Sequence, residues 1–132
     1  MEDKIMKQEE KNLFLKDLCS RLPYGVKLDT LDGSQELDIR WLSINMCNIS
    51  SPYLSYLFPL SNMTEEQYEE FINISGWDVD IEDIRRGKFS CIGYVGLDVM
   101  YDAIDWFNKN HFDYRGLIPM GLAIDATGKN IY

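Results

Sequence analysis

The sequence has few residues of the kinds that bind metals or form disulfides. It contains one histidine, His111, and three cysteines, Cys19, Cys47 and Cys91, which are widely spaced and form no Cys-x-x-Cys pair. An odd, dispersed set of this kind supports neither a disulfide framework nor a zinc site. We therefore expect reduced, mostly buried thiols, no bound metal and no cofactor.

Long apolar segments are also absent. No run approaches the roughly 20 apolar residues that a membrane helix needs. The first ten residues mix acids with lysines and lack the apolar region of a secretory signal. These two absences predict a cytoplasmic protein that does not enter a membrane.

Lysine and arginine are missing from a long central stretch, between Arg40 and Arg85. The eight acids of this stretch account for most of the net charge of −9, and they are Glu65, Glu66, Glu69, Glu70, Asp78, Asp80, Glu82 and Asp83. Such a negative field repels phosphate backbones, so direct nucleic-acid binding is not expected. A solvated face that keeps the protein soluble is the ordinary interpretation, and a surface for a positive partner or an imitation of nucleic acid are the alternatives.

Known catalytic and phosphate-binding motifs are not matched. Gly93-Tyr94-Val95-Gly96 precedes a predicted helix, but it lacks the third glycine and the basic residue of a phosphate-binding turn. Ser90, Cys91 and Cys19 do not lie in the sequence motifs that surround a catalytic serine or cysteine. The sequence thus favours a non-enzymatic role.

Length and composition are those of one globular domain spanning residues 1–132. Apolar residues make up 45% of the 132 residues and charged residues 27%, far from the composition of disordered chains. A chain of this length buries about two thirds of the surface that its unfolded form exposes.

The first half predicts one helix followed by strands. Apolar residues recur at helical spacing over residues 9–22, with Lys11, Lys16, Asp17 and Arg21 between them, and Pro23 and Gly25 end the helix. Alternating segments at 26–30, 37–47 and 53–58, with a turn at Asp32-Gly33, predict a small antiparallel meander.

The second half predicts two further helices. Thr64 and Gln67 have the spacing of a capping box, with Met63 and Tyr68 placed for a hydrophobic staple. Residues 77–84 fit an edge strand or a loop, and 89–94 a short strand. Apolar residues cover more than half the circumference of a helix at 97–110, which we expect to be central and buried on most sides.

Together these elements predict an α+β fold. About three to five antiparallel strands pack with the N-terminal helix, the capped acidic helix and the largely buried C-terminal helix.

The histidine and its neighbours form one candidate site. His111 follows the last helix, where a charged imidazole is favoured by the helix C-terminus, and we expect a capping histidine beside an Asp113–Arg115 contact. The alternative is a small enzymatic or ligand-binding domain built around His111, Asp113, Tyr114 and Arg115.

Three aspartates on the last predicted helix form a second candidate. Asp98, Asp102 and Asp105 share one face, close enough to hold a cation or to act as an acid and base pair. The polar strip of an otherwise apolar helix is the ordinary interpretation.

Three blocks of the sequence resemble a family of short, uncharacterised proteins encoded in gut-bacterial genomes and their phages or mobile elements. The blocks lie at 16–27, at 56–66 and at 105–123, and they include the segments Arg21-Leu22-Pro23-Tyr24-Gly25 and His111-Phe112-Asp113-Tyr114-Arg115-Gly116. The resemblance implies a bacterial or phage cytoplasmic setting and supplies no activity. It suggests that Tyr24 and His111 to Arg115 form a shared surface.

The function expected from the sequence is that of a non-enzymatic interaction or accessory protein of phage or mobile-element type, with an unknown protein partner. An acidic inhibitor that imitates nucleic acid and the His111-centred domain remain alternatives. The oligomeric state stays open.

Overall fold

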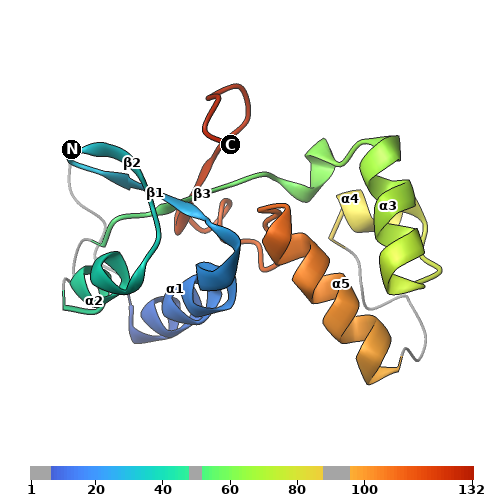
Figure 1. Cartoon of the computed structure of the whole chain (residues 1–132), viewed down its shortest axis with the longest axis horizontal. Coiled ribbons are helices and arrows are strands. Elements are labelled where there is room, and N and C mark those ends of the chain that lie inside the picture. The colour runs from blue at the N-terminus through green and yellow to red at the C-terminus, as the bar shows by residue number, and fades with distance from the viewer. Residues whose placement is uncertain (1–6, 48–51, 88–95) are drawn as a thin grey trace.

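The computed structural model describes residues 7–47, 52–87 and 96–132 of the chain (Figure 1). Within these residues the chain forms five α-helices, two short 3-10 helices and a four-stranded mixed sheet. This arrangement confirms the predicted α+β class. None of the helices in the described ranges is long and apolar enough to cross a membrane.

The first helix is the one that the sequence predicts. α1 spans Gln8–Arg21 and continues into the 3-10 helix η1, Leu22–Tyr24, which ends at Gly25 with a φ of 73°. Its buried stripe is Phe14, Asp17, Leu18 and Arg21, at the i, i+3, i+4 and i+7 positions of one helix face. Two charged residues that we expected on the polar side therefore face the core.

The expected hairpin is present, but its return strand comes directly after the turn and not at the predicted residues 37–47. β1, Lys27–Thr30, pairs antiparallel with β2, Gly33–Glu36, through a two-residue loop. The prediction of strand over residues 37–47 is wrong, because this segment forms α2, Ile39–Cys47.

A local cap and a tertiary contact explain α2. The Asp38 carboxylate accepts a hydrogen bond from the Trp41 amide at 2.9 Å, as an N-cap residue does. Trp41 and Asn45, one turn apart, are buried, and Trp41 packs edge-on against the Tyr53 ring at 5.7 Å. The Asn45 side chain donates to the Tyr53 carbonyl and accepts from the Tyr53 amide, at 3.0 and 2.9 Å.

The sheet is mixed and is not a meander. β3, Ser55–Leu57, lies within the predicted third strand, and it pairs antiparallel with β1 rather than with β2. β4, Ala123–Asp125, pairs parallel with β3, which gives the strand order β2-β1-β3-β4. The parallel pair joins segments that lie far apart in the sequence.

The capped helix follows the short 3-10 helix η2, Leu60–Asn62. α3 spans Glu65–Ser75, and the Thr64 and Gln67 side chains each accept from the other's backbone amide, at 3.1 and 2.9 Å. Met63 is buried, as the staple requires. The predicted capping box is confirmed.

The segment after α3 is partly helical. Residues 77–80 are irregular and bury Trp77 and Val79, and α4, Ile81–Arg85, begins at Asp80, whose carboxylate accepts from the Glu82 amide. The edge-strand alternative for 77–84 is therefore wrong. The strand predicted at 89–94 lies outside the described residues.

The last helix is less buried than predicted. α5 spans Leu97–Lys109 and buries only Ala103 and the residues from Trp106 to Asn108. Leu97 and Tyr101 are 74% and 64% exposed. The expectation of burial on most sides is wrong, because no described element covers the side of α5 that carries Leu97 and Tyr101.

The core has two parts. One lies among α1, α2 and the sheet and includes Phe14, Leu28, Trp41, Leu57, Leu117 and Leu122. The other lies among α3, α4 and α5 and includes Met63, Phe71, Trp77, Ile84, Trp106 and Phe112. We call the described residues of 7–57 and 113–132 the sheet half, and those of 58–112 the helical half, which lie side by side in Figure 1.

Hydrogen bonds join the two halves. The Asp113 amide of the sheet half donates to the Phe58 carbonyl of the helical half at 2.8 Å, beside a bond within the helical half from the Phe58 amide to the His111 carbonyl, also at 2.8 Å. From α1, the Arg21 guanidinium donates to the Phe112 carbonyl at 2.6 Å. The predicted site from His111 to Arg115 therefore lies at the junction.

Candidate functional site

His111 is packed at the junction and is not a charged cap. Its backbone has a φ of 62°, and its ring stacks on the Tyr132 ring with the centroids 3.7 Å apart. Burial, followed by the charges of Arg21 and Lys27, lowers the pKa of His111 to about 4. The imidazole is neutral at pH 7, which corrects the prediction of a charged capping histidine.

Tyr132 holds the other side of this stack. Its hydroxyl accepts from the Lys27 amide and donates to the Tyr56 carbonyl, at 2.8 and 2.7 Å. Burial raises the pKa of Tyr132 to about 12, so the phenol stays protonated. The pair is a packing contact between the C-terminal segment and the end of α5, without a nucleophile.

Asp113 shapes a turn. It is 6% exposed, and its two carboxylate oxygens accept from the Leu117 and Ile118 amides at 2.8 and 2.9 Å. The predicted Asp113–Arg115 contact is wrong, because both partners are engaged elsewhere. Arg115 bonds to Asp17 and Ser20 of α1, at 2.8 and 3.3 Å.

A buried ionic cluster surrounds Asp17. This carboxylate is fully buried and pairs with Arg21, also fully buried, and with Arg115, both at 2.8 Å. Two cations thus share one anion. The sequence signal was available, since Asp17 and Arg21 fall in the i, i+3, i+4, i+7 stripe with Phe14 and Leu18, but we expected charged residues to face solvent.

Tyr114 lies among the cations of this cluster. The Arg115 and Arg21 guanidinium carbons lie 4.8 and 5.2 Å from its ring centroid, and its ring stacks on Phe107 at 5.6 Å. Both distances suit a cation–π contact. Its hydroxyl oxygen is buried and makes no hydrogen bond to a described residue.

A cleft of about 390 Å³ opens beside this cluster. One wall is the turn from Asp113 to Pro119, and the other walls are the end of α4 and the start of η2. Three arginines line it, Arg85, Arg86 and Arg115, and of these only Arg115 is a site residue predicted from the sequence. The chain has five arginines, so the cleft gathers most of them.

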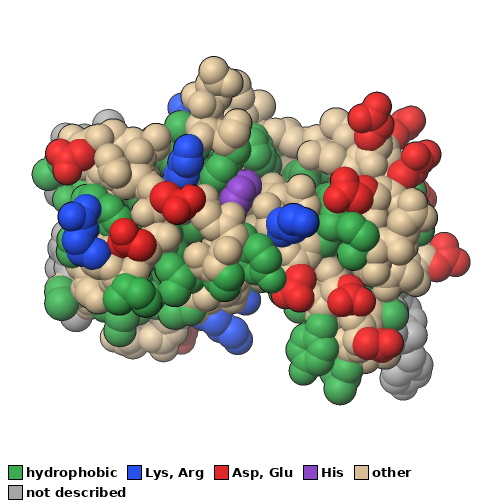
Figure 2. Space-filling view, viewed as in Figure 1, with side chains coloured by type: hydrophobic (Ala, Val, Ile, Leu, Met, Phe, Trp, Pro, Cys, Tyr) green, Lys and Arg blue, Asp and Glu red, His purple; other side chains and the backbone are tan. Residues whose placement is uncertain are grey.

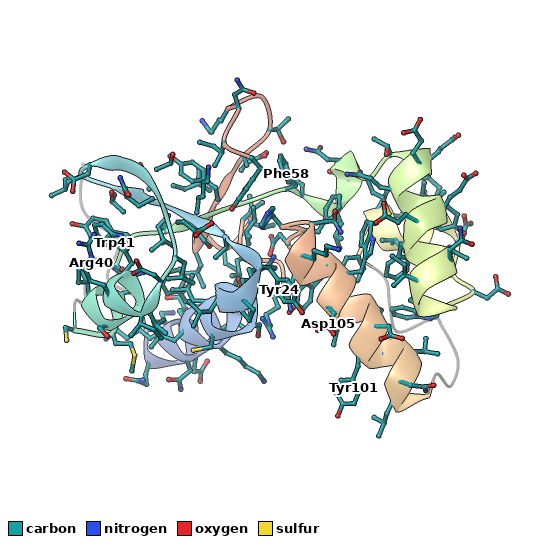
Figure 3. The ribbon with its side chains drawn as sticks, viewed as in Figure 1. Tyr24, Arg40, Trp41, Phe58, Tyr101 and Asp105 are labelled. Atoms are coloured by element: carbon teal, nitrogen blue, oxygen red, sulfur yellow. The ribbon has the colours of Figure 1, made fainter. Side chains whose placement is uncertain are left out.

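The five residues of the predicted surface separate. Asp113, Tyr114 and Arg115 line the cleft, whereas His111 and Tyr24 are not among its lining residues. Tyr24 instead faces Asp105 of α5 (Figure 3), and partial burial, then the charge of Asp105 and a hydrogen bond to it, raise the pKa of the Tyr24 phenol.

The eight residues of the predicted acidic surface all belong to the helical half. Glu65, Glu66, Glu69 and Glu70 are exposed on one side of α3. Asp78 and Asp80 lie near Tyr68, whose pKa is raised by burial and then by these two charges. Glu82 pairs with Arg85 at 2.8 Å. Figure 2 shows carboxylates gathered along the outer edge of this half.

The three aspartates of α5 are also exposed. Asp98, Asp102 and Asp105 are exposed on the side of α5 that also presents Leu97 and Tyr101. The Trp106 indole nitrogen donates to Glu70 of α3 at 3.3 Å, and Asp102 lies one turn before Trp106.

The described thiols are exposed and do not gather with other metal-binding side chains. Cys19 and Cys47 are exposed, which corrects the expectation that the thiols are mostly buried, and Cys91 lies outside the described residues. Cys19 lies beside the buried stripe of α1, not in it. Among the described residues, no group of three His, Cys, Asp or Glu side chains could hold a metal ion.

Comparison of the chain with protein-family models, with curated proteins and with solved structures found no match.

Proposed function

We propose that this protein is a non-enzymatic interaction protein and that α5 docks a basic, amphipathic segment of a partner protein. The proposal rests on one observation, the exposed apolar pair Leu97 and Tyr101 among the aspartates of α5. The proposed bacterial or phage cytoplasmic setting rests on the sequence resemblance alone.

The apolar pair supports docking because it is large and uncovered. Leu97 and Tyr101 are one helical turn apart, and Figure 3 shows Tyr101 projecting away from α3. Burying a side chain of this size contributes about 1.5–3 kcal/mol. Tyrosine is enriched in protein interfaces, where its ring packs and its hydroxyl stays hydrated.

The charge around the pair supports a basic partner. The helical half has eleven Asp and Glu residues and three Lys and Arg residues among those described, a net charge of −8. On α5, Lys109 is the one cation among three aspartates. Such a field attracts cationic segments and accelerates their association in a salt-dependent way.

The test uses the full chain and a synthetic helical peptide with leucines on one face and lysines on the other. Fluorescence anisotropy at low and physiological salt measures the affinity. We expect the Leu97→Ser, Tyr101→Ser double variant to weaken binding about tenfold, the loss of about 1.4 kcal/mol. The Asp98→Asn, Asp102→Asn variant should reduce the salt dependence.

The matched control changes an apolar pair in the sheet half. Ile39 and Met46 of α2 are 67% and 55% exposed, so Ile39→Ser, Met46→Ser removes similar surface at another place. The proposal is rejected if this control weakens binding as much as the α5 variant, or if the α5 variant binds like the unaltered chain.

A further inference from the structure

We infer that the arginine-lined cleft at the junction binds a small organic phosphate monoester. This inference is independent of the α5 docking proposal, because the cleft and the α5 face share no residue. It rests on the convergence of Arg85, Arg86 and Arg115 on one cavity of a strongly acidic protein.

Two of these guanidinium groups are held in place by the protein and keep free donors. Arg85 donates twice to the Met63 carbonyl, at 3.0 and 2.8 Å, and once to Glu82. Arg115 donates to Asp17 and to Ser20. An arginine has five N–H donors, so about two on Arg85 and about three on Arg115 remain for a ligand.

Arg86 is the arginine of the cleft that has no ion-pair partner among the described residues. Its side chain is exposed. Its position next to Arg85, at the C-terminal end of α4, brings a third guanidinium to the cleft. Phosphate oxygens bind such planar, bidentate donors well.

One acidic side chain lines the cleft, and it is bound to the backbone of its own turn. Asp113 is the one carboxylate among the lining residues, and its two oxygens accept from the Leu117 and Ile118 amides. Outside the lining, Glu82 pairs with Arg85 and Asp17 pairs with Arg115. Arg86 is therefore the arginine of the lining that has no carboxylate partner among the described residues, and its positive charge favours an anionic ligand.

The remaining walls suit the organic part of the ligand. Pro59, Leu60, Ile118 and Pro119 provide apolar surface, and Tyr114 provides an aromatic ring. A volume of about 390 Å³ is within the range of small-molecule sites, roughly 300–1,000 Å³. An ester with a small apolar body fits these walls better than free phosphate.

The test is an NMR titration of the isotopically labelled full chain with phenyl phosphate, inorganic phosphate, benzoate and phenol. We expect phenyl phosphate to shift the amide signals of Gly87 and Gly116 and to bind more tightly than inorganic phosphate. Phenol should cause no such shifts. Benzoate binding as tight as that of phenyl phosphate would overturn the assignment to phosphate.

Two variants test the arginines. Arg86→Gln should weaken phenyl phosphate binding about tenfold, because it removes charge-assisted hydrogen bonds. Arg40→Gln is the matched control: Arg40 lies over the Trp41 ring of α2, at 4.7 Å, outside the cleft, and its loss changes the net charge equally. The inference fails if the two variants bind alike, or if phenyl phosphate shifts no amide signal at the cleft.

Discussion

The two halves of the molecule use charge in opposite ways. The sheet half has nine Asp and Glu residues against eight Lys and Arg residues among those described, close to balance, and it buries an ionic cluster around Asp17. The helical half has a net charge of −8 and exposes most of it, over a core that is rich in aromatic rings.

The buried charges of the sheet half therefore hold parts of the fold together, whereas the exposed charges of the helical half face solvent. A buried ion is costly unless paired, so the Asp17 cluster fixes α1 against the turn that contains Arg115. The acids of the helical half are mostly exposed, and those without a partner act through their field. Removing charge should therefore affect stability in the sheet half and recognition in the helical half.

Breaking the Asp17 cluster is the strongest test of this comparison. Asp17→Ala leaves two arginines without their shared anion, one of them fully buried, and we expect a loss of about 3–5 kcal/mol in the free energy of unfolding. Chemical denaturation measures it.

Glu82→Ala, which breaks the exposed pair with Arg85, is the matched change in the helical half and should cost less than about 1 kcal/mol. Equal losses in the two variants would remove the distinction between the halves.

The junction between the halves should weaken on acidification. The folded pKa of His111 is about 4, against 6.5 for the ordinary value, so between these two pH values the unfolded chain binds a proton that the folded chain does not. Stability from this group is complete above about pH 6.5 and is lost as the pH falls towards 4. Because the ring is partly exposed, we expect a loss of about 1–2 kcal/mol.

His111→Phe isolates this effect. Phenylalanine keeps an aromatic ring against Tyr132 and does not titrate, so unfolding free energies measured from pH 7 to pH 4 should have a smaller slope in the variant. An unchanged slope would show that His111 is not the group responsible. The slope is the readout because the substitution itself can shift stability at every pH.

A smaller effect than that of His111 is expected at the N-terminus of α3. Thr64→Ala removes the hydroxyl that accepts from the Gln67 amide, and it should cost about 1 kcal/mol of unfolding free energy. Thr64→Ser, which keeps the hydroxyl, is the control. If Ala and Ser behave alike, the cap does not stabilise α3.

The elements predicted best from the sequence are those fixed by near neighbours. The capping box at Thr64 and Gln67 involves residues three apart, and the structure has both of its hydrogen bonds. By contrast, the alternation at 37–47 also suits a helix with Trp41 and Asn45 on one side. Tyr53, eight residues further along the chain than Asn45, provides the contacts that favour the helix.

The candidate site was partly predictable for the same reason. Residues 111–115 are contiguous, and three of them line the cleft. Arg85 and Arg86 join them only through the folding of the helical half against the turn at 113–119, which no spacing in the sequence indicates. The exposure of Leu97 and Tyr101 was also missed, because an apolar pattern does not reveal whether another element covers it.

The parallel pairing of β3 with β4 has a consequence for synthesis on the ribosome. The sheet-half core combines residues up to Leu57 with Leu117, Leu122 and Ala123, whereas the helical-half core is built from the continuous segment between them. A growing chain can therefore complete the helical half first. The core of the sheet half cannot form until the last segment has been synthesised, and its apolar residues stay exposed until then. We therefore expect the pairing of β3 with β4 to be the slow and aggregation-sensitive step of folding.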